Sequence, residues 1–274
     1  MPGKLHKNKH SILAKRHRNF FLQFIQDLGY NEKKRFFMDP AKNASAGLKN
    51  AFLFYFVTTG GKIMIEMKQL PVVRGNVPLR YARGHFATNH SHINYYIDIT
   101  FQKTRLSEAR AVAHELVAGL HTTTQVDTIL CLDGTAVIGT CLADELTKSG
   151  FRSINAHNTI YVLEPEYNAN SQIIFRDNNK SMIRGKHVLV LMASMTTGFT
   201  AKRSVEAIGY YGGYVAGVAA LYSAVRDAGG YPVASVYTLG DLPDYASYDY
   251  RECPYCKQGI PLDALVNSFG YSAL

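Results

Sequence analysis

A loop rich in threonine and glycine follows a short apolar run, and its residue types could bind a phosphate group. Hydroxyl groups from Thr196, Thr197 and Thr200 can converge on a phosphate, while Gly198 lets the backbone approach it closely. The unpaired N–H groups at the start of a helix attract the same anion. The loop therefore predicts a site for a phosphate ester.

The segments on both sides of this loop have the pattern needed to position it. Four apolar residues at 188–191 are typical of a buried parallel strand, and residues 201–207 have helical character. A second β-rich run at 126–131 leads into the turn Leu-Asp-Gly-Thr at 132–135, and helical spacing follows at 137–148. The order of strand, turn and helix thus occurs twice.

Further runs extend this alternation. Strands are predicted at 159–163, 172–176, 214–221 and 234–238, a helix at 106–120, and two short strands around a polar turn at 84–98. Alternating strands and helices imply right-handed crossovers and an α/β fold with a doubly wound parallel sheet. Because ligands bind at the carboxyl ends of the strands in such sheets, the turns at 132–135 and 194–200 should share one edge and form the site.

Four motifs occur in the order found in type I phosphoribosyltransferases, and residues 84 to about 262 resemble the orotate phosphoribosyltransferases. Segment 188–207 is similar to the family's phosphate-binding signature, and segment 132–139 is similar to its pyrophosphate loop. The tail at 253–262 is similar to the Cys-Pro-x-Cys-x-x-Gly ending of some bacterial orotate enzymes. Segment 84–98 is similar to an N-terminal motif of the orotate enzymes, with matching residues at Gly84, Phe86, Ser91, Tyr96 and Asp98.

The resemblance implies a fold, an activity and a set of residue roles. The fold would be a Rossmann-like sheet with a small N-terminal hood, in a protein that is commonly a homodimer. The activity would be transfer of a 5-phosphoribosyl group from phosphoribosyl pyrophosphate (PRPP) to a nucleobase such as orotate, with pyrophosphate leaving and Mg2+ assisting. The implied contacts are Ser194, Thr196, Thr197, Gly198 and Thr200 for the 5-phosphate, the backbone N–H groups of Asp133, Gly134 and Thr135 for the pyrophosphate, and Thr88, Asn89, His90 and Tyr95 for the base.

Segment 164–180 occupies the place of the family's mobile catalytic loop. The resemblance implies that Arg176 and Lys180 bring positive charge onto the leaving group. The segment lacks the family's Lys-x-x-Lys-x-His run, however, and both side chains could instead be solvated surface charges. A similar choice concerns Tyr95 and Tyr96, which could stack on a base or belong to the core.

The sequence departs from the family at two positions before the phosphate loop. Two adjacent acids bind the ribose hydroxyls in the family, whereas this chain has Met192 and Ala193. Each lost charged hydrogen bond could cost about 1.5 to 3 kcal/mol, with Ser194 and Asp133 as partial substitutes. Two functional classes therefore stay open: an orotate phosphoribosyltransferase-like enzyme, and a non-catalytic regulatory module that binds PRPP or a nucleotide.

Cysteine and histidine residues give a weaker signal. Cys253 and Cys256 form half of a zinc knuckle, and two more ligands would have to come from elsewhere, such as a dimer partner. The histidines His85, His90 and His92 have no acidic residue or cysteine close to them in sequence. The sequence therefore favours no metal site apart from the Mg2+ that accompanies the substrate.

Charge divides the chain unevenly. Residues 1–63 carry 12 Lys or Arg and 3 Asp or Glu, whereas the other 211 residues carry 18 of each. The basic part could be a disordered extension, an arm for nucleic acid or membrane surfaces, or translated leader before a start at Met64 or Met67. The neutral part, 64–274, predicts no nucleic-acid partner. Its predicted parts are a hood at 84–100, a core at 106–240 and a tail at 250–274.

Signals for a cellular compartment are few. The first 30 residues show no secretory signal, and the sequence contains no run of about 18 apolar residues that would predict a transmembrane helix. Of the four cysteines, Cys131 and Cys141 lie in apolar surroundings that are typical of reduced core residues. These features predict a cytoplasmic protein that binds small molecules and no membrane.

Overall fold

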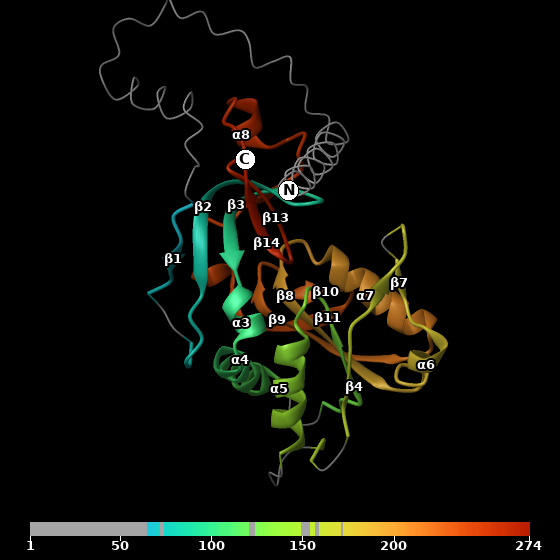
Figure 1. Ribbon diagram of the computed structural model, residues 1–274. Coiled ribbons are helices and arrows are strands. Elements are labelled where there is room, and N and C mark those ends of the chain that lie inside the picture. Colours follow the sequence, from blue (N-terminus) through green and yellow to red (C-terminus); the bar gives the residue numbers. More distant parts are fainter. Residues whose placement is uncertain (1–64, 72–73, 121–123, 149–153, 157–158, 171) are drawn as a thin grey trace, which may run out of the picture. The chain divides into compact units, whose positions relative to one another are not determined.

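A computed structural model describes residues 65–71, 74–120, 124–148, 154–156, 159–170 and 172–274 (Figure 1). The basic segment 1–63 and the alternatives for its role lie outside these described residues. The described residues belong to one compact unit, which holds two six-stranded sheets. No helix in the described ranges is long and apolar enough to cross a bilayer.

The sheet that carries the predicted site is mainly parallel. Every neighbouring pair runs parallel except the pair at one edge, β10 with β11. The predicted doubly wound parallel sheet is therefore confirmed, with one antiparallel edge strand. The strand order is β10 (Asp227–Ala228), β11 (Tyr231–Thr238), β9 (Tyr214–Ser223), β8 (His187–Met195), β4 (Thr128–Cys131) and β5 (Tyr161–Leu163).

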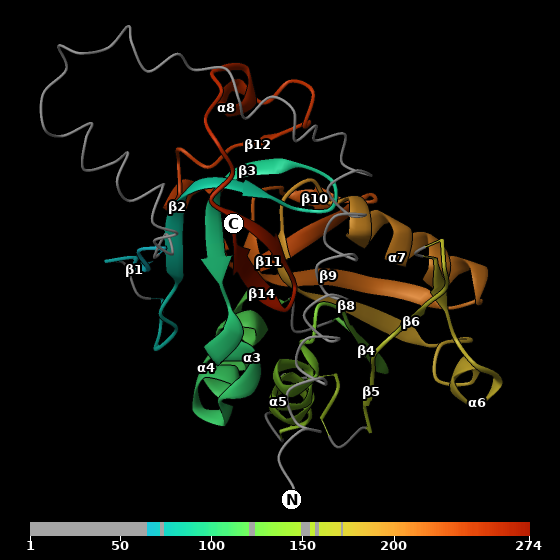
Figure 2. The same ribbon diagram turned by 45° about the horizontal axis from the view of Figure 1, so that its top comes forward.

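Helices cover both faces of this sheet. α4 (Leu106–Gly119) and α5 (Ala136–Thr147) pack on one face, and α7 (Phe199–Tyr210) packs on the other, as both views show (Figures 1 and 2). Neighbouring residues of β8 follow this division, because Leu189 lies in the core cluster of α4 and α5 while Val190 lies in the cluster of α7. The continuous apolar run of β8 thus reflects burial on both faces.

The second sheet joins the predicted hood to the C-terminal tail. β13 runs parallel to β2, with Ala264 opposite Phe86. The tail is therefore part of the hood, through a pairing between distant segments that no local pattern predicts. The strand order is β12 (Ser247–Tyr248), β3 (His92–Asp98), β2 (Arg80–Ala87), β13 (Ala264–Asn267) and β14 (Gly270–Ala273), and β1 (Lys68–Gln69) also pairs with β2.

Short elements connect the strands of the two sheets. The segment predicted as a mobile loop contains an antiparallel hairpin followed by one turn of helix. The short elements are α3 (Thr100–Thr104), β6 (Glu166–Tyr167), β7 (Ile173–Ile174), α6 (Asp177–Lys180), η3 (Leu239–Asp241) and α8 (Pro254–Lys257).

Candidate functional site

The two predicted turns follow neighbouring strands at the carboxyl edge of the parallel sheet. β4 pairs with β8 so that Cys131 lies opposite Leu191, and the N–H of Leu132 donates to the Leu191 carbonyl at 2.8 Å. β4 ends there and the turn at 132–135 follows, whereas β8 continues to Met195 before the loop that leads into α7. The prediction that both turns follow strands at one edge of the sheet is confirmed, since β4 and β8 run parallel.

The turn after β8 leads into an uncapped helix start. Gly198 is the N-cap residue of α7 and has a φ of 74°, a left-handed conformation that favours glycine. No side chain caps α7 within the described residues, and the Phe199 N–H reaches the Thr197 hydroxyl at a long 3.5 Å. The backbone N–H groups in the first turn of α7 therefore have no capping side chain and can bind an anion. Of the remaining predicted phosphate contacts, Ser194 is half-buried near the end of β8, and Thr196 and Thr200 are half-buried on either side of the turn.

The turn after β4 is held by a lysine that the sequence did not single out. Asp133 and Gly134 have positive φ values of 58° and 73°. The Nζ of Lys103, from α3, donates to the Asp133 carbonyl at 2.9 Å and also to the Ser268 carbonyl. A Cβ placed at Gly134 would lie 3.9 Å from the same Nζ. An ammonium group thus lies beside the predicted pyrophosphate turn, where it favours a bound anion.

Thr135 closes this turn instead of facing a ligand. Its N–H donates to the Leu132 carbonyl at 3.1 Å, and its hydroxyl donates to the same oxygen at 2.7 Å. The residue is fully buried. The expectation that the Thr135 N–H faces a pyrophosphate is therefore wrong, because the tight turn uses that donor itself.

Apolar packing fills the positions of the missing acid pair. Met192 is 4% exposed and lies in the α7 cluster, whereas Ala193 is 5% exposed and lies in the cluster of α4 and α5. The Ala193 N–H donates to the Asp133 carboxyl group. Burial raises the pKa of that carboxyl group, while Lys103 and the hydrogen bond from Ala193 act in the opposite direction. Asp133 thus places one carboxyl group beside the end of β8.

The polar turn of the hood reaches the phosphate loop through an aromatic contact. The rings of His90, between β2 and β3, and Phe199, at the start of α7, lie 5.8 Å apart between centroids. Asn89 and His90 are exposed at this turn. The Thr88 hydroxyl instead accepts hydrogen bonds from the N–H groups of His90 and Ser91, at 3.2 and 2.9 Å. The predicted base-binding turn therefore lies next to the predicted phosphate loop, with Thr88 holding its shape.

Tyr95 belongs to the core of the hood. It is 2% exposed, and its ring lies 5.6 Å from the Tyr81 ring and 6.2 Å from the Tyr245 ring. Burial raises the pKa of its hydroxyl group. Of the two roles that the sequence left open for Tyr95, the structure favours the core role over base stacking.

The two charges of segment 164–180 form local ion pairs at the surface. Arg176 donates from its Nε to Glu166 at 2.7 Å, and Lys180 donates to Asp177 at 2.6 Å. The structure thus supports the interpretation of both as solvated surface charges. In the same segment, burial of the Tyr167 hydroxyl group and the negative charge of Asp133 raise the pKa of Tyr167 to about 12.

The histidines of the hood and the cysteines of the tail come together in the fold. The Sγ of Cys256 lies 3.3 Å from the Nδ1 of His92, and the Sγ of Cys253 lies 3.4 Å from the Nε2 of His85. The premise that no cysteine is close to these histidines is therefore wrong in three dimensions. The pairing of β13 with β2 explains the error, because it carries the tail back to the hood.

No family model matches this chain, but curated relatives match parts of it. The orotate phosphoribosyltransferase of Caldanaerobacter subterraneus is 36% identical over 83 residues, which are 29% of this chain and 40% of that protein. That of Caldicellulosiruptor bescii is 28% identical over 121 residues, 40% of this chain and 60% of the relative. That of Thermotoga maritima is 33% identical over 114 residues, 38% of this chain and 58% of the relative. The chain thus spans between 40% and 60% of these relatives' lengths.

Solved structures of orotate phosphoribosyltransferases also resemble this chain. One is the orotate phosphoribosyltransferase of Aeropyrum pernix, with a TM-score of 0.42 and 20% identity over 60% of this chain and 92% of that chain. Another is the Mycobacterium tuberculosis orotate phosphoribosyltransferase in complex with inorganic phosphate, with a TM-score of 0.39 and 22% identity over 55% of this chain and 82% of that chain.

Proposed function

We propose that this chain, which resembles the orotate members of the type I phosphoribosyltransferases, transfers a 5-phosphoribosyl group from PRPP to a nucleobase such as orotate. One observation carries the proposal. The parallel pairing of β4 and β8 places a left-handed turn at Asp133 and Gly134 and the uncapped start of α7 at the same edge of the sheet, after neighbouring strands. Two anion-binding turns at one edge suit a sugar that carries a phosphate at one end and a pyrophosphate at the other.

Residue roles follow from this arrangement. The start of α7, with the hydroxyl groups of Thr196, Thr197 and Thr200, would hold the 5-phosphate. The N–H groups of Asp133 and Gly134 would face the pyrophosphate, with the ammonium of Lys103 beside them. That ammonium would stabilise the negative charge that grows on the pyrophosphate as it leaves. The exposed turn at Asn89 and His90 would border the base, next to Phe199.

The turn at Asp133 and Gly134 also fits a magnesium ion that arrives with the substrate. Mg2+ in such sites binds one or two carboxylates together with phosphate oxygens and water. Asp133 supplies a carboxyl group next to Ala193 at the strand ends, and we propose it as the protein ligand. The bound ion would neutralise charge on the leaving pyrophosphate.

A non-catalytic module that binds PRPP or a nucleotide is the second candidate. It is favoured by the buried, apolar side chains of Met192 and Ala193, which cannot accept hydrogen bonds from ribose hydroxyls. Phosphate binding at α7 would remain, because it depends on backbone N–H groups. Ribose recognition would rest on Asp133 and Ser194.

Pyrophosphate release separates the two candidates. The purified chain is incubated with PRPP, Mg2+ and orotate, and in parallel with a panel of purine and pyrimidine bases. Turnover with any base supports the transferase and identifies its acceptor. Thermal stabilisation by PRPP without turnover supports the binding module. If PRPP produced no turnover and no thermal stabilisation, both candidates would be contradicted.

Replacing Gly198 by alanine tests the phosphate loop. The left-handed φ of 74° should cost an alanine about 1 kcal/mol of stability, and relief of this strain should shift the loop away from its phosphate-binding conformation. The added methyl group itself would lie in ordinary contact with the protein, 3.5 Å from the Val225 side chain and 3.7 Å from that of Ala228. We expect the affinity for PRPP, measured by calorimetry, to fall about tenfold. Gly185→Ala is the matched control, because Gly185 has a similar φ of 67° and open space around it, outside both turns. Equal losses of affinity in the two variants would contradict a role for Gly198 in binding.

The proposal also covers the oligomeric state, the cellular compartment and the metabolic role of the protein. We propose a homodimer in the cytoplasm, acting in pyrimidine nucleotide metabolism. All four cysteines are free in the structure, which is consistent with a reducing compartment. Sedimentation of the purified chain with and without PRPP tests the dimer.

A further inference from the structure

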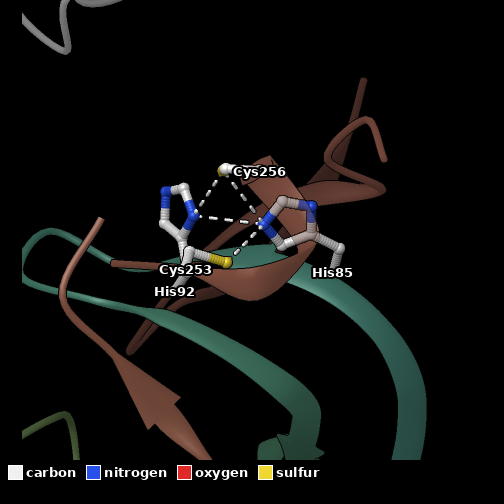
Figure 3. A group of neighbouring side chains, drawn as sticks. All are labelled: His85, His92, Cys253 and Cys256. Carbon is white, nitrogen blue, oxygen red and sulfur yellow. Dashed lines mark hydrogen bonds between the residues drawn. The ribbon is translucent and has the colours of Figure 1, made fainter. Parts of the chain in front are cut away.

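Four side chains with metal-binding atoms converge between the hood hairpin and the tail (Figure 3). His85 comes from β2 and His92 from β3, on either side of the polar turn. Cys253 directly precedes α8, and Cys256 lies within it. Their ligand atoms all lie within 4.8 Å of one another, although His85 and Cys256 are 171 residues apart in sequence.

Four of the six distances between these atoms match the edges of a metal-centred tetrahedron. Zinc binds histidine nitrogen at about 2.0 Å and thiolate sulfur at about 2.3 Å, so tetrahedral edges measure about 3.3 to 3.8 Å. The Nε2 of His85 lies 3.1 Å from the Nδ1 of His92, 3.4 Å from the Sγ of Cys253 and 3.7 Å from the Sγ of Cys256. The Nδ1 of His92 lies 3.3 Å from the Sγ of Cys256. These four separations span the expected range to within about 0.2 Å.

The second nitrogen of His85 fixes which atom faces the cluster. The Nδ1 lies 3.0 Å from the Ile260 carbonyl and 3.2 Å from the Pro261 carbonyl. Because carbonyl oxygens only accept, this Nδ1 must carry the proton, and the Nε2 keeps a lone pair that points at the other three atoms. A backbone carbonyl that orients a histidine in this way is typical of metal ligands in proteins.

Hydrogen bonding alone accounts poorly for the arrangement. The single lone pair on the Nε2 of His85 can accept one good hydrogen bond, yet three polar atoms lie within 3.7 Å of it. His85 and Cys253 are also 2% and 0% exposed, so water does not explain the convergence. One cation at the centre satisfies all four atoms at once, and its two positive charges balance two thiolates.

We propose that His85, His92, Cys253 and Cys256 bind one structural zinc ion that clamps the C-terminal tail onto the hood hairpin. The four protein ligands close the coordination sphere, which is the mark of a structural site. His85 and His92 flank the turn that carries Asn89 and His90, so the metal also fixes the turn that reaches Phe199. This inference stands independently of the transferase proposal, since the site contains neither phosphate loop.

Metal content of the full-length chain is the first test. The protein is purified without a histidine tag and without chelator, from cells grown with added zinc, and analysed by mass spectrometry of the metals. We expect about one zinc per chain. A chain that holds no zinc, and whose metal-free form takes up none in a titration against a chromogenic chelator, would overturn the proposal. Iron in place of zinc would overturn the choice of metal.

Single substitutions locate the ion. Cys256→Ser is the informative variant, because Cys256 is exposed and its replacement leaves no buried gap. We expect its zinc content to fall at least tenfold and the thiolate-to-metal absorption of the cobalt-loaded protein to weaken. Cys141→Ala and His114→Gln are matched controls outside the cluster and should keep both signals. Retention of zinc by Cys256→Ser and by His92→Gln would overturn the assignment of ligands.

Chelation tests the clamp without any substitution. A strong chelator should lower the melting temperature of the wild-type chain and of Cys141→Ala by at least about 5 °C, because metal binding energy is folding energy in such sites. Cys256→Ser should melt at the lower temperature with or without chelator. If the melting temperature of the wild-type chain were the same with and without chelator, a structural role for the metal would be contradicted.

Discussion

Replacing Met192 by aspartate is expected to lower the free energy of unfolding by about 3 to 5 kcal/mol, because it places an unpaired carboxylate in the α7 core cluster. The side chain is 4% exposed, and its neighbours in the cluster include Val190 and Ile208. Chemical denaturation of the purified variant measures the loss. Restoring the acid of the family pattern should therefore damage the fold before it can improve binding.

Met192→Leu is the matched control, since it keeps the volume and apolar character and should cost less than about 1.5 kcal/mol. A Met192→Asp variant as stable as the wild type would contradict the expectation. It would show that the carboxylate reaches solvent at the strand end, as a ribose-binding acid must. In that case PRPP should stabilise the variant more strongly than the wild-type chain.

Replacing Lys103 by methionine is expected to weaken the binding of PRPP about 10- to 100-fold. The expectation follows from the loss of one charged interaction with the pyrophosphate, worth about 1.5 to 3 kcal/mol. The Nζ of Lys103 already holds the Asp133 carbonyl at 2.9 Å, so its removal should also loosen the turn. Calorimetric titration with PRPP and Mg2+ measures the affinity.

Lys148→Met controls for the loss of one positive charge, because Lys148 is exposed at the end of α5 and pairs locally with Glu145 and Asp144. It should leave the affinity for PRPP unchanged. Inorganic phosphate provides a second comparison, since its binding at the start of α7 should be unaffected by Lys103→Met. An unchanged affinity of Lys103→Met for PRPP would remove Lys103 from the site.

The sheet and its two turns were predictable because their signals are local. A run of four apolar residues at 188–191 predicts a strand buried on both faces, and β8 is such a strand. The run at 126–131 and the helical spacing at 137–148 correspond to β4 and α5. Parallel strands end at one edge, so the placement of both turns at that edge followed from the order of elements alone.

The roles of single side chains were harder to predict because they depend on which donors the fold itself uses. Thr135 has the residue type of a phosphate ligand, but the turn engages its N–H and its hydroxyl. Tyr95 has the type of a stacking residue, but the hood packs around it. Lys103 gave no signal, because α3 brings it to Asp133 from 30 residues away.

The sequence by itself determined the α/β class, the parallel direction of the central strands and the placement of the two turns at one edge of the sheet. These features depend on hydrophobic periodicity and on glycine at left-handed positions, which are properties of short segments. The tertiary structure alone decided the union of hood and tail in one sheet, the lysine beside the turn at 132–135 and the cluster of two histidines and two cysteines. Each of these depends on a contact between segments far apart in the chain, and the energy of such a contact comes from packing that no local pattern contains.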